Sequence, residues 1–375
     1  MELGYSPAGS FISDNQSAAV ATRLDSPCAE GAAGACSAPR AHTGEGAPLV
    51  VGGVSLRNRC FLAPMSGVSD LPFRRIAARY GAGLVVSEMV ASDALVGGDG
   101  ETVLRSVGEG IFPHVVQLAG REARWMAEGA RMAEAAGADI IDINMGCPAK
   151  RVTTGYSGSA LMRDLDHAMT LVEATVSAAS VPVTLKMRLG WDEKTINAAE
   201  LARRAEDAGI ALVTVHGRTR CQFYKGQADW DAIRAVRDAV SIPLVANGDC
   251  GSADDAREMM RRSGADAVMV GRASYGRPWL AGQIGAELNG EDVPEQPRGV
   301  ALADLVTGHY EALLEHYGVH IGLRAARKHL GWYLDAAGIE CPGANRRILM
   351  TAEDPAVVLR LVEEIFRDGD VRSAA

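Results

Sequence analysis

Short apolar segments alternate with amphipathic segments along most of this chain of 375 residues. Eight apolar segments, each six or seven residues long, are followed by segments in which apolar residues recur three and four positions apart, as at 122–136 and 198–208. Apolar runs of this length are typical of strands that are buried on both faces. Eight such strands alternating with helices predict a closed, parallel (β/α)8 TIM barrel. The predicted strands are 60–65, 83–88, 113–118, 139–145, 182–188, 211–217, 243–249 and 267–272.

The two ends of the chain differ in composition from the middle. Residues 1–48 are rich in Ala, Gly and Ser without a sustained period, which predicts a disordered leader. The barrel is expected to occupy 49–290 and to begin with a hairpin at 49–56. Several Pro, Gly and Glu residues at 286–299 predict a linker, and 291–375 is expected to form a second, all-helical domain. Its helical periods lie at 301–317, 321–336 and 354–367.

Composition limits the compartment and the partners. A net charge of −9 argues against a general nucleic-acid binder, so any contact with nucleic acid must come from a local patch. The seven cysteines are scattered, with no C-x-x-C pair, which predicts free thiols and argues against a metal site. No apolar run reaches the roughly 18 residues of a membrane span, and the N-terminus lacks the pattern of a signal peptide. We therefore expect a cytoplasmic protein that binds neither membrane nor metal.

Polar side chains recur where the predicted strands end. In a (β/α)8 barrel the active site lies at the carboxyl ends of the strands. A polar residue within an apolar strand is costly unless it is paired, so the convergence of many on one barrel mouth predicts a binding site. These residues include Ser66, Glu88, Gln117, Asn144, Lys186, His216, Asn247 and Arg272.

The last two strands carry a more specific signal. Asn247-Gly248-Asp249 and Gly271-Arg272 place small residues and backbone N–H groups where this fold commonly holds a phosphate. Arg272 can add a charge-assisted hydrogen bond. The absence of a G-x-G-x-x-G motif after any strand argues against a Rossmann dinucleotide site. Both loops could simply be tight turns before the helices that follow, but because both show these features we expect them to hold the phosphate of a cofactor.

Two further residues are candidates for the chemistry. Lys186, inside a predicted strand, could form a Schiff base or could serve as a fixed cation beside an electron-rich cofactor. Cys147 lies between Gly146 and Pro148 in a turn that follows a strand. A free cysteine is commonly a small core residue, but this position favours a functional thiol, either a nucleophile or a proton donor.

Several stretches of the chain resemble the tRNA-dihydrouridine synthases, most closely the bacterial B-type subgroup. The resemblance is spread in order over 49–335. Its most specific motifs are APMSGVSDLPFR (63–74), IIDINMGCPAKRV (140–152), VPVTLKMRLGW (181–191), HGRTR (216–220), IPLVANGD (242–249), GADAVMVGRASYGRPW (264–279) and ARKHLGWYL (326–334).

The resemblance implies a flavin-dependent oxidoreductase in which NADPH reduces FMN and the C5=C6 bond of a tRNA uridine is then reduced. It implies that Cys147 is the general acid that protonates C5, and that Asn144 and Tyr224 contact the uracil. It also implies a target in the D-loop, with position 17 favoured, although ribosomal RNA stays open as a substrate. The implied FMN-binding residues are Pro64, Met65, Ser66, Gln117, Lys186, His216, Asn247, Gly248, Asp249, Gly271 and Arg272.

A basic stretch in the helical domain is the expected contact with tRNA. Arg324, Arg327 and Lys328 share one face of a predicted helix, within a segment that contains no acidic residue. We expect this face to bind RNA phosphates, and we expect the protein to be a monomer. Two alternatives stay open: an FMN barrel that acts on a free pyrimidine or a small enone, and an RNA-binding protein that has lost catalysis.

Overall fold

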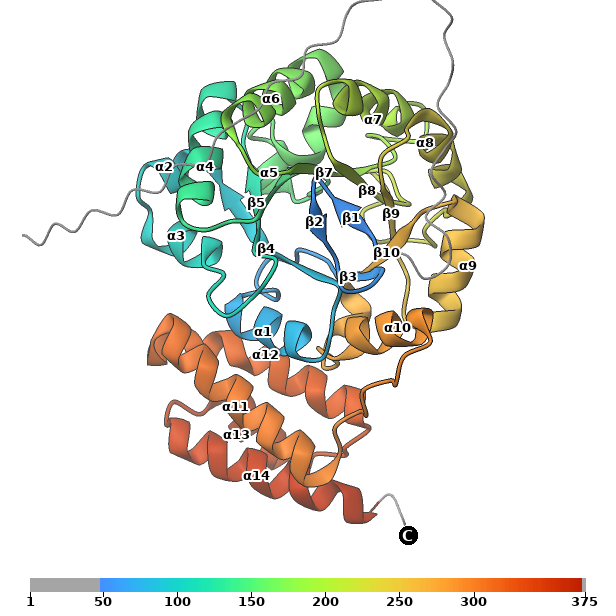
Figure 1. Cartoon of the computed structure of the whole chain (residues 1–375). Coiled ribbons are helices and arrows are strands. Elements are labelled where there is room, and N and C mark those ends of the chain that lie inside the picture. The colour runs from blue at the N-terminus through green and yellow to red at the C-terminus, as the bar shows by residue number, and fades with distance from the viewer. Residues whose placement is uncertain (1–47, 373–375) are drawn as a thin grey trace, which may run out of the picture. The chain divides into compact units, whose positions relative to one another are not determined.

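The structure, a computed structural model, describes residues 48–372, with side chains described to residue 367. Eight parallel strands close into a barrel in the order of the sequence (Figure 1). Each predicted apolar segment overlaps one of these strands, so the predicted (β/α)8 barrel is confirmed. The strands are β3 (Cys60–Leu62), β4 (Leu84–Ala91), β5 (Val115–Ala119), β6 (Ile140–Met145), β7 (Val183–Arg188), β8 (Leu212–His216), β9 (Leu244–Asn247) and β10 (Ala267–Val270).

Helices surround the barrel (Figure 1). Helix α9 illustrates why they form where they do: Ser252 caps its first turn, Asp254 and Asp255 follow, and Gly264 ends it at a φ of 68°. The main helices are α1 (Leu71–Arg79), α4 (Ala123–Ala135), α6 (Leu165–Ala178), α7 (Ala198–Asp207), α8 (Arg234–Ala239), α9 (Ala253–Ser263) and α10 (Leu280–Asn289). Shorter elements are α2 (Ser92–Val96), α3 (Gly100–Ser106), α5 (Lys150–Thr153), η1 (Gly158–Arg163), η2 (Asp231–Ile233) and η3 (Arg272–Ser274).

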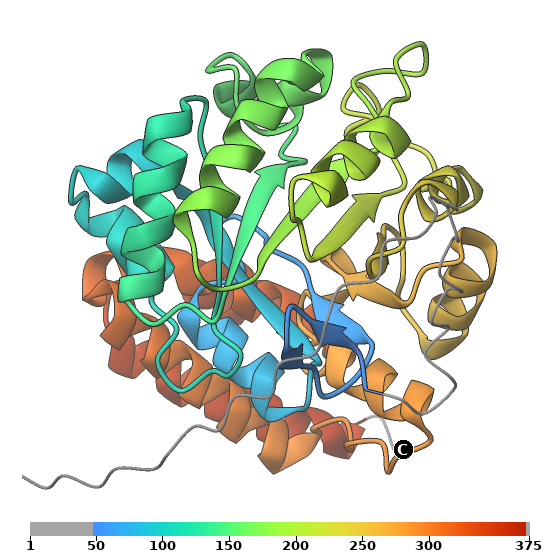
Figure 2. The ribbon, with the colours of Figure 1, turned by 45° about the horizontal axis from the view of Figure 1, so that its top comes forward.

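The expected hairpin is present and covers one end of the barrel. Strands β1 (Val50–Val51) and β2 (Val54–Ser55) pair antiparallel and lie across the barrel in Figures 1 and 2. Leu49, Val51 and Leu56 are buried in one cluster with residues from the amino ends of the strands, such as Phe61 and Ile140. The hairpin therefore closes the amino end, which leaves the carboxyl end for a site.

Four helices follow the barrel: α11 (Gly299–Tyr317), α12 (Val319–Ala337), α13 (Gly343–Thr351) and α14 (Pro355–Arg372). They pack around an apolar core that includes Val306 and Leu330, and Trp279, which directly precedes α10, belongs to the same cluster. The three predicted helical periods are all helices. Helix α13 was not predicted, because it buries only Leu349 and so shows little apolar period.

The predicted linker, 286–299, is partly helical. Helix α10 continues to Asn289 and so includes the first part of 286–299, because Leu280 and Ile284 are buried in the barrel core. Composition alone did not show this packing. The predicted leader, 1–48, lies outside the described residues except for Pro48. Among the helices described, none is both long and apolar enough to span a membrane.

Candidate active site

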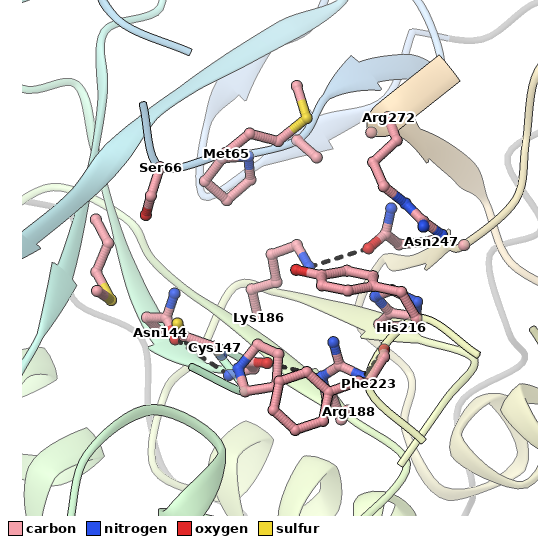
Figure 3. A pocket seen from close by; sticks show the side chains of 18 of the residues that line it. Met65, Ser66, Asn144, Cys147, Lys186, Arg188, His216, Phe223, Asn247 and Arg272 are labelled. Carbon is pink, nitrogen blue, oxygen red and sulfur yellow. Dashed lines mark hydrogen bonds between the residues drawn. The ribbon is translucent and has the colours of Figure 1, made fainter. Parts of the chain in front are cut away.

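A pocket with a volume of about 620 Å³ lies at the carboxyl ends of the barrel strands (Figure 3). This volume is in the range of sites that hold a cofactor or another small molecule. The residues predicted from strand ends and motifs converge on it. Those that line it are Pro64, Met65, Ser66, Gln117, Asn144, Cys147, Lys186, His216, Tyr224, Asn247, Gly248, Asp249, Gly271 and Arg272.

Lys186 of β7 occupies the middle of the pocket, with Asn144 and Cys147 on one side and Asn247 on the other (Figure 3). Its ammonium donates to Asn247 Oδ1 at 3.0 Å, and Asn247 Nδ2 in turn donates to Met269 O at 2.8 Å. Burial and, secondarily, the nearby charge of Arg188 lower the pKa of Lys186 to about 8. The side chain therefore remains largely a cation at neutral pH.

His216 lies at the end of β8 and is neutral. Burial and the surrounding cations, Arg188 first among them, lower its pKa well below the usual value. Its Nε2 lies 3.2 Å from Nη1 of Arg218, which can only donate, so Nε2 accepts and the ring proton is on Nδ1. The ring can thus donate one hydrogen bond toward a bound group without adding charge.

The turn after β9 is held by an ion pair. Asp249 has a φ of 59°, and its carboxylate accepts from Arg218 at 3.0 and 2.5 Å and from Ala228 N at 2.8 Å. Burial raises the pKa of Asp249, but these hydrogen bonds outweigh burial and leave it below the usual value. Since the carboxylate is occupied, what this turn offers a phosphate is its backbone.

The loops after β9 and β10 leave space for a phosphorylated group. A Cβ placed on Gly271 would approach only Ala63 Cβ and Met65 Sδ, at 3.9 and 4.0 Å, so it would project into open pocket space. Arg272 is close by, and about half of its side chain is exposed. Together with Lys186, these residues fit an anionic cofactor at this end of the pocket.

Cys147 is held in its turn from both sides. Its backbone N–H donates to Asn144 Oδ1 at 3.0 Å, and its carbonyl accepts from the hydroxyl of Ser159 at 2.8 Å. A Cβ on Gly158, which has a φ of 59°, would lie 2.9 Å from that carbonyl, so only glycine fits there. Burial raises the pKa of the Cys147 thiol, so it stays protonated near neutral pH.

Arg188 is a pocket residue to which the sequence assigned no role. It is 1% exposed and donates to Gly146 O at 2.8 Å and to Thr219 O and Phe223 O at 2.9 Å. It thereby joins the Cys147 turn to the loop after β8. The available signal was its position two residues beyond Lys186, since alternate residues of a strand share one face.

Tyr224 lies at the rim, with 49% of its surface exposed. Guanidinium carbons of Arg188 and Arg272 lie 5.6 and 4.6 Å from the centre of its ring. Both distances are within the range of a cation–π interaction. The ring is therefore presented at the mouth by charged side chains.

The three basic residues of α12 lie outside the pocket and differ in exposure. Arg324 is exposed, whereas Arg327 is half-buried and donates to Thr351 O at 3.4 Å. Lys328 is also half-buried, and its Nζ would lie 3.8 Å from a Cβ on Gly67. Only Arg324 of the three presents a largely open charge.

Comparison with known proteins identifies the family. The family model described as dihydrouridine synthase matches residues 61–368. The chain belongs to the dihydrouridine synthase family. The matched range includes every residue that lines the pocket.

Curated members of the dihydrouridine synthase family match almost over their full length. A probable tRNA-dihydrouridine synthase of Rhizobium leguminosarum bv. phaseoli is 59% identical over 324 residues, which cover 86% of this chain and 100% of the relative. The tRNA-dihydrouridine synthase B of Vibrio vulnificus is 46% identical over 288 residues, which cover 76% of this chain and 89% of the relative.

Solved structures of proteins with low sequence identity share the barrel fold of this chain. The 6-hydroxypseudooxynicotine amine oxidase of Pseudomonas geniculata has a TM-score of 0.51 at 16% identity, covering 66% of this chain and 50% of that chain. Histamine dehydrogenase of a Rhizobium species has a TM-score of 0.50 at 16% identity, covering 71% of this chain and 50% of that chain. These similarities concern the fold alone.

Proposed function

We propose that this chain reduces one uridine of tRNA to 5,6-dihydrouridine, with NADPH as the reductant, FMN as the cofactor and Cys147 as the proton donor. The observation that carries the proposal is a protonated thiol, Cys147, in one pocket with the buried cation Lys186. Membership of the dihydrouridine synthase family and the names of the curated relatives support the substrate.

Gly248, Gly271 and Arg272 are proposed to hold the phosphate of FMN. When bound and reduced, the flavin would supply the hydride that C6 of the uracil ring requires. Lys186 would stabilise negative charge beside the cofactor, and neutral His216 would donate a hydrogen bond without adding charge. The remaining proposed contacts are Pro64, Met65, Ser66, Gln117, Asn247 and the backbone of Asp249.

Cys147 is proposed to complete the reduction by protonating C5. A thiol serves as an acid only while it carries its proton, and burial keeps the pKa of Cys147 above neutrality. A nucleophilic role would require the thiolate, which this environment disfavours. Asn144 and Tyr224 are proposed to contact the uracil, one from inside the pocket and one from its rim.

The segment 291–375 is proposed to bind tRNA, and the protein is proposed to act in the cytoplasm. Arg324 offers the most exposed charge to RNA phosphates, with Arg327 and Lys328 beside it. The uridine must leave its stack to reach the pocket, at a cost of a few kcal/mol. Position 17 of the D-loop is the proposed target, and the protein is proposed to act as a monomer.

The proposal is tested by mapping dihydrouridine in RNA from cells that lack this chain and by assaying the purified protein. The protein is expected to be yellow, to bleach with NADPH and to modify a tRNA transcript. Cys147→Ala should still bleach but form at least 100-fold less dihydrouridine, whereas Cys341→Ala, a half-buried cysteine of the helical segment, should behave as the wild type. A colourless protein that does not bind FMN, or full turnover by Cys147→Ala, would contradict the proposal. If cells that lack this chain lose dihydrouridine only from ribosomal RNA and not from tRNA, ribosomal RNA is the substrate.

A further inference from the structure

A row of buried side chains runs from the floor of the barrel to the turn that carries Cys147. Asn144 Oδ1 accepts from the backbone N–H groups of Gly146 and Cys147, at 3.2 and 3.0 Å. Asn144 Nδ2 donates to Gln117 Oε1 at 2.7 Å, and Gln117 Nε2 donates to Asp142 Oδ2 at 2.7 Å. Two amide groups thus connect a carboxylate on β6 to the backbone of the turn.

The carboxylate gives the row its direction. A side-chain amide has a donor end and an acceptor end of nearly the same shape, so an amide between two partners can turn either way round. Burial raises the pKa of Asp142, and the hydrogen bonds from Thr184 and Gln117 oppose that rise. Both neighbours donate to its carboxylate, which as an anion can only accept. Gln117 must therefore direct its nitrogen toward Asp142 and its oxygen toward Asn144. Asn144 must then direct its own nitrogen toward Gln117 and its oxygen toward the backbone of Cys147.

Because the three side chains of the row are buried, reversing its direction would leave hydrogen-bonding groups unpaired. Asp142, Gln117 and Asn144 are 4%, 0% and 7% exposed, so water does not readily replace a lost partner. The second oxygen of Asp142 accepts from the hydroxyl of Thr184 at 2.6 Å. If the row reversed, the Asn144 nitrogen would face the two N–H donors of the turn, and those donors would be left unpaired.

We propose that Asp142 is a positioning residue whose carboxylate orients Gln117 and Asn144 and so fixes the turn that presents Cys147. Asp142 does not line the pocket and acts through its neighbours. Its importance for turnover rests on the proposed role of Cys147, but its effect on the turn does not. The two can therefore be separated by experiment.

The test is hydrogen–deuterium exchange of the amides of Gly146 and Cys147, followed by mass spectrometry of the full-length protein. Each variant is compared with wild type at the same flavin content. Asp142→Asn keeps the size of the side chain but removes the fixed acceptor, and exchange is expected to be about tenfold faster, as for the loss of one hydrogen bond. Thr184→Val is the matched control, since it removes the other partner of Asp142 without changing the direction of the row.

A double variant moves the carboxylate from position 142 to position 117, the next member of the row. In Asp142→Asn with Gln117→Glu, the new carboxylate at 117 accepts from both neighbours, so Asn144 again directs its oxygen to the turn. Exchange should return to within about threefold of wild type. Unchanged exchange in Asp142→Asn, or a double variant that exchanges as fast as the single one, would overturn the proposal.

A second variant and an activity measurement extend the test. If Asp142→Asn does not fold, Gln117→Met interrupts the row one position higher and should give the same acceleration; slow exchange there overturns the inference equally. Dihydrouridine formation by Asp142→Asn should fall at least tenfold while the KM for tRNA stays within twofold. The exchange result needs neither tRNA nor turnover, so it stands even if the proposed reaction fails.

Discussion

The hydroxyl of Tyr317 on α11 lies 3.5 Å from Oε2 of Glu88, a buried residue in the middle of β4. The other oxygen of Glu88 accepts from Gly67 N at 2.5 Å, and Gly67 directly follows Ser66 in the wall of the pocket. The same hydroxyl lies 3.4 Å from Asp70 Oδ2. One tyrosine therefore connects the helical segment to the loop beside the proposed flavin site.

Tyr317→Phe should weaken that connection. Its removal leaves the buried carboxylates Asp70 and Glu88 with one donor fewer, which is expected to lower the free energy of unfolding by about 1–2 kcal/mol. Flavin affinity, measured by fluorescence titration, should fall several-fold because the 64–67 loop is less firmly held. Tyr310→Phe on the same helix is the control: the Tyr310 hydroxyl is buried without a hydrogen-bond partner in the part of the chain that the structure describes. Equal effects of the two substitutions would contradict the proposed connection.

Lys186→Met should reduce the affinity for FMN at least tenfold. The substitution removes the central cation of the pocket and leaves Asn247 Oδ1 without its donor. An effect of about 1.5–3 kcal/mol is typical of a hydrogen bond from a charged group. Equilibrium dialysis against FMN measures it, with the exposed Lys225→Met as the matched control. Undiminished binding by Lys186→Met would remove Lys186 from the cofactor site.

The buried histidine of α11 should make the protein less stable in acid. Burial, and secondarily the charge of Lys328, lowers the pKa of His309 to about 3. An unfolded histidine gains its proton near pH 6.5, so below that pH the unfolded state binds more protons and the free energy of unfolding falls as the pH falls. At pH 5 the loss from this one group is about 2 kcal/mol.

His309→Gln should remove that part of the pH dependence. Glutamine can still pair with the Tyr333 hydroxyl, which lies 2.9 Å from His309 Nδ1, but it does not titrate. Urea unfolding of wild type and variant at pH 7 and pH 5 gives the difference, with the exposed His320→Gln as the matched control. If wild type and His309→Gln lose the same stability between the two pH values, the neutral buried state of His309 is wrong.

Arg324→Ala should weaken tRNA binding and reduce the slope of log K against log salt by about one. Lys328→Met should reduce the slope less than Arg324→Ala does, because Lys328 is half-buried and Asp70 and Glu88 already interact with its charge. Arg360→Ala, an exposed arginine of α14, controls for the loss of any surface charge. Filter binding between 50 and 200 mM salt gives the slopes, and equal slopes for Arg324→Ala and wild type would argue against a phosphate contact.

The barrel could be predicted from the sequence because each strand has the same local pattern. Each is a short apolar run, and the carboxyl ends of parallel strands converge, so residues as far apart as Gln117 and Arg272 could be brought together without coordinates. The same rule could have extended to Asp142 and Arg188, which lie two residues from Asn144 and Lys186 on the same strand faces. It did not distinguish a residue that faces the cofactor from one that supports it.

Contacts between the barrel and the helical segment had no such local signal. Tyr317 and Glu88 are separated by 229 positions and lie in elements whose relative placement depends on packing. Arg324, Arg327 and Lys328 share a helix face in sequence, yet the neighbouring helices and the barrel leave them with different exposure. Helical periodicity indicates which face is polar but not what lies opposite it.

The hairpin of β1 and β2 has a kinetic consequence. Because it closes the amino end of the barrel, a nicotinamide and a uridine must both reach the proposed flavin through the mouth where Tyr224 lies. We expect two reactants that share this entrance to exclude each other, so that the oxidised nucleotide departs before RNA binds. Initial rates should give parallel lines in double-reciprocal plots, and an excess of either reactant should inhibit by competing with the other.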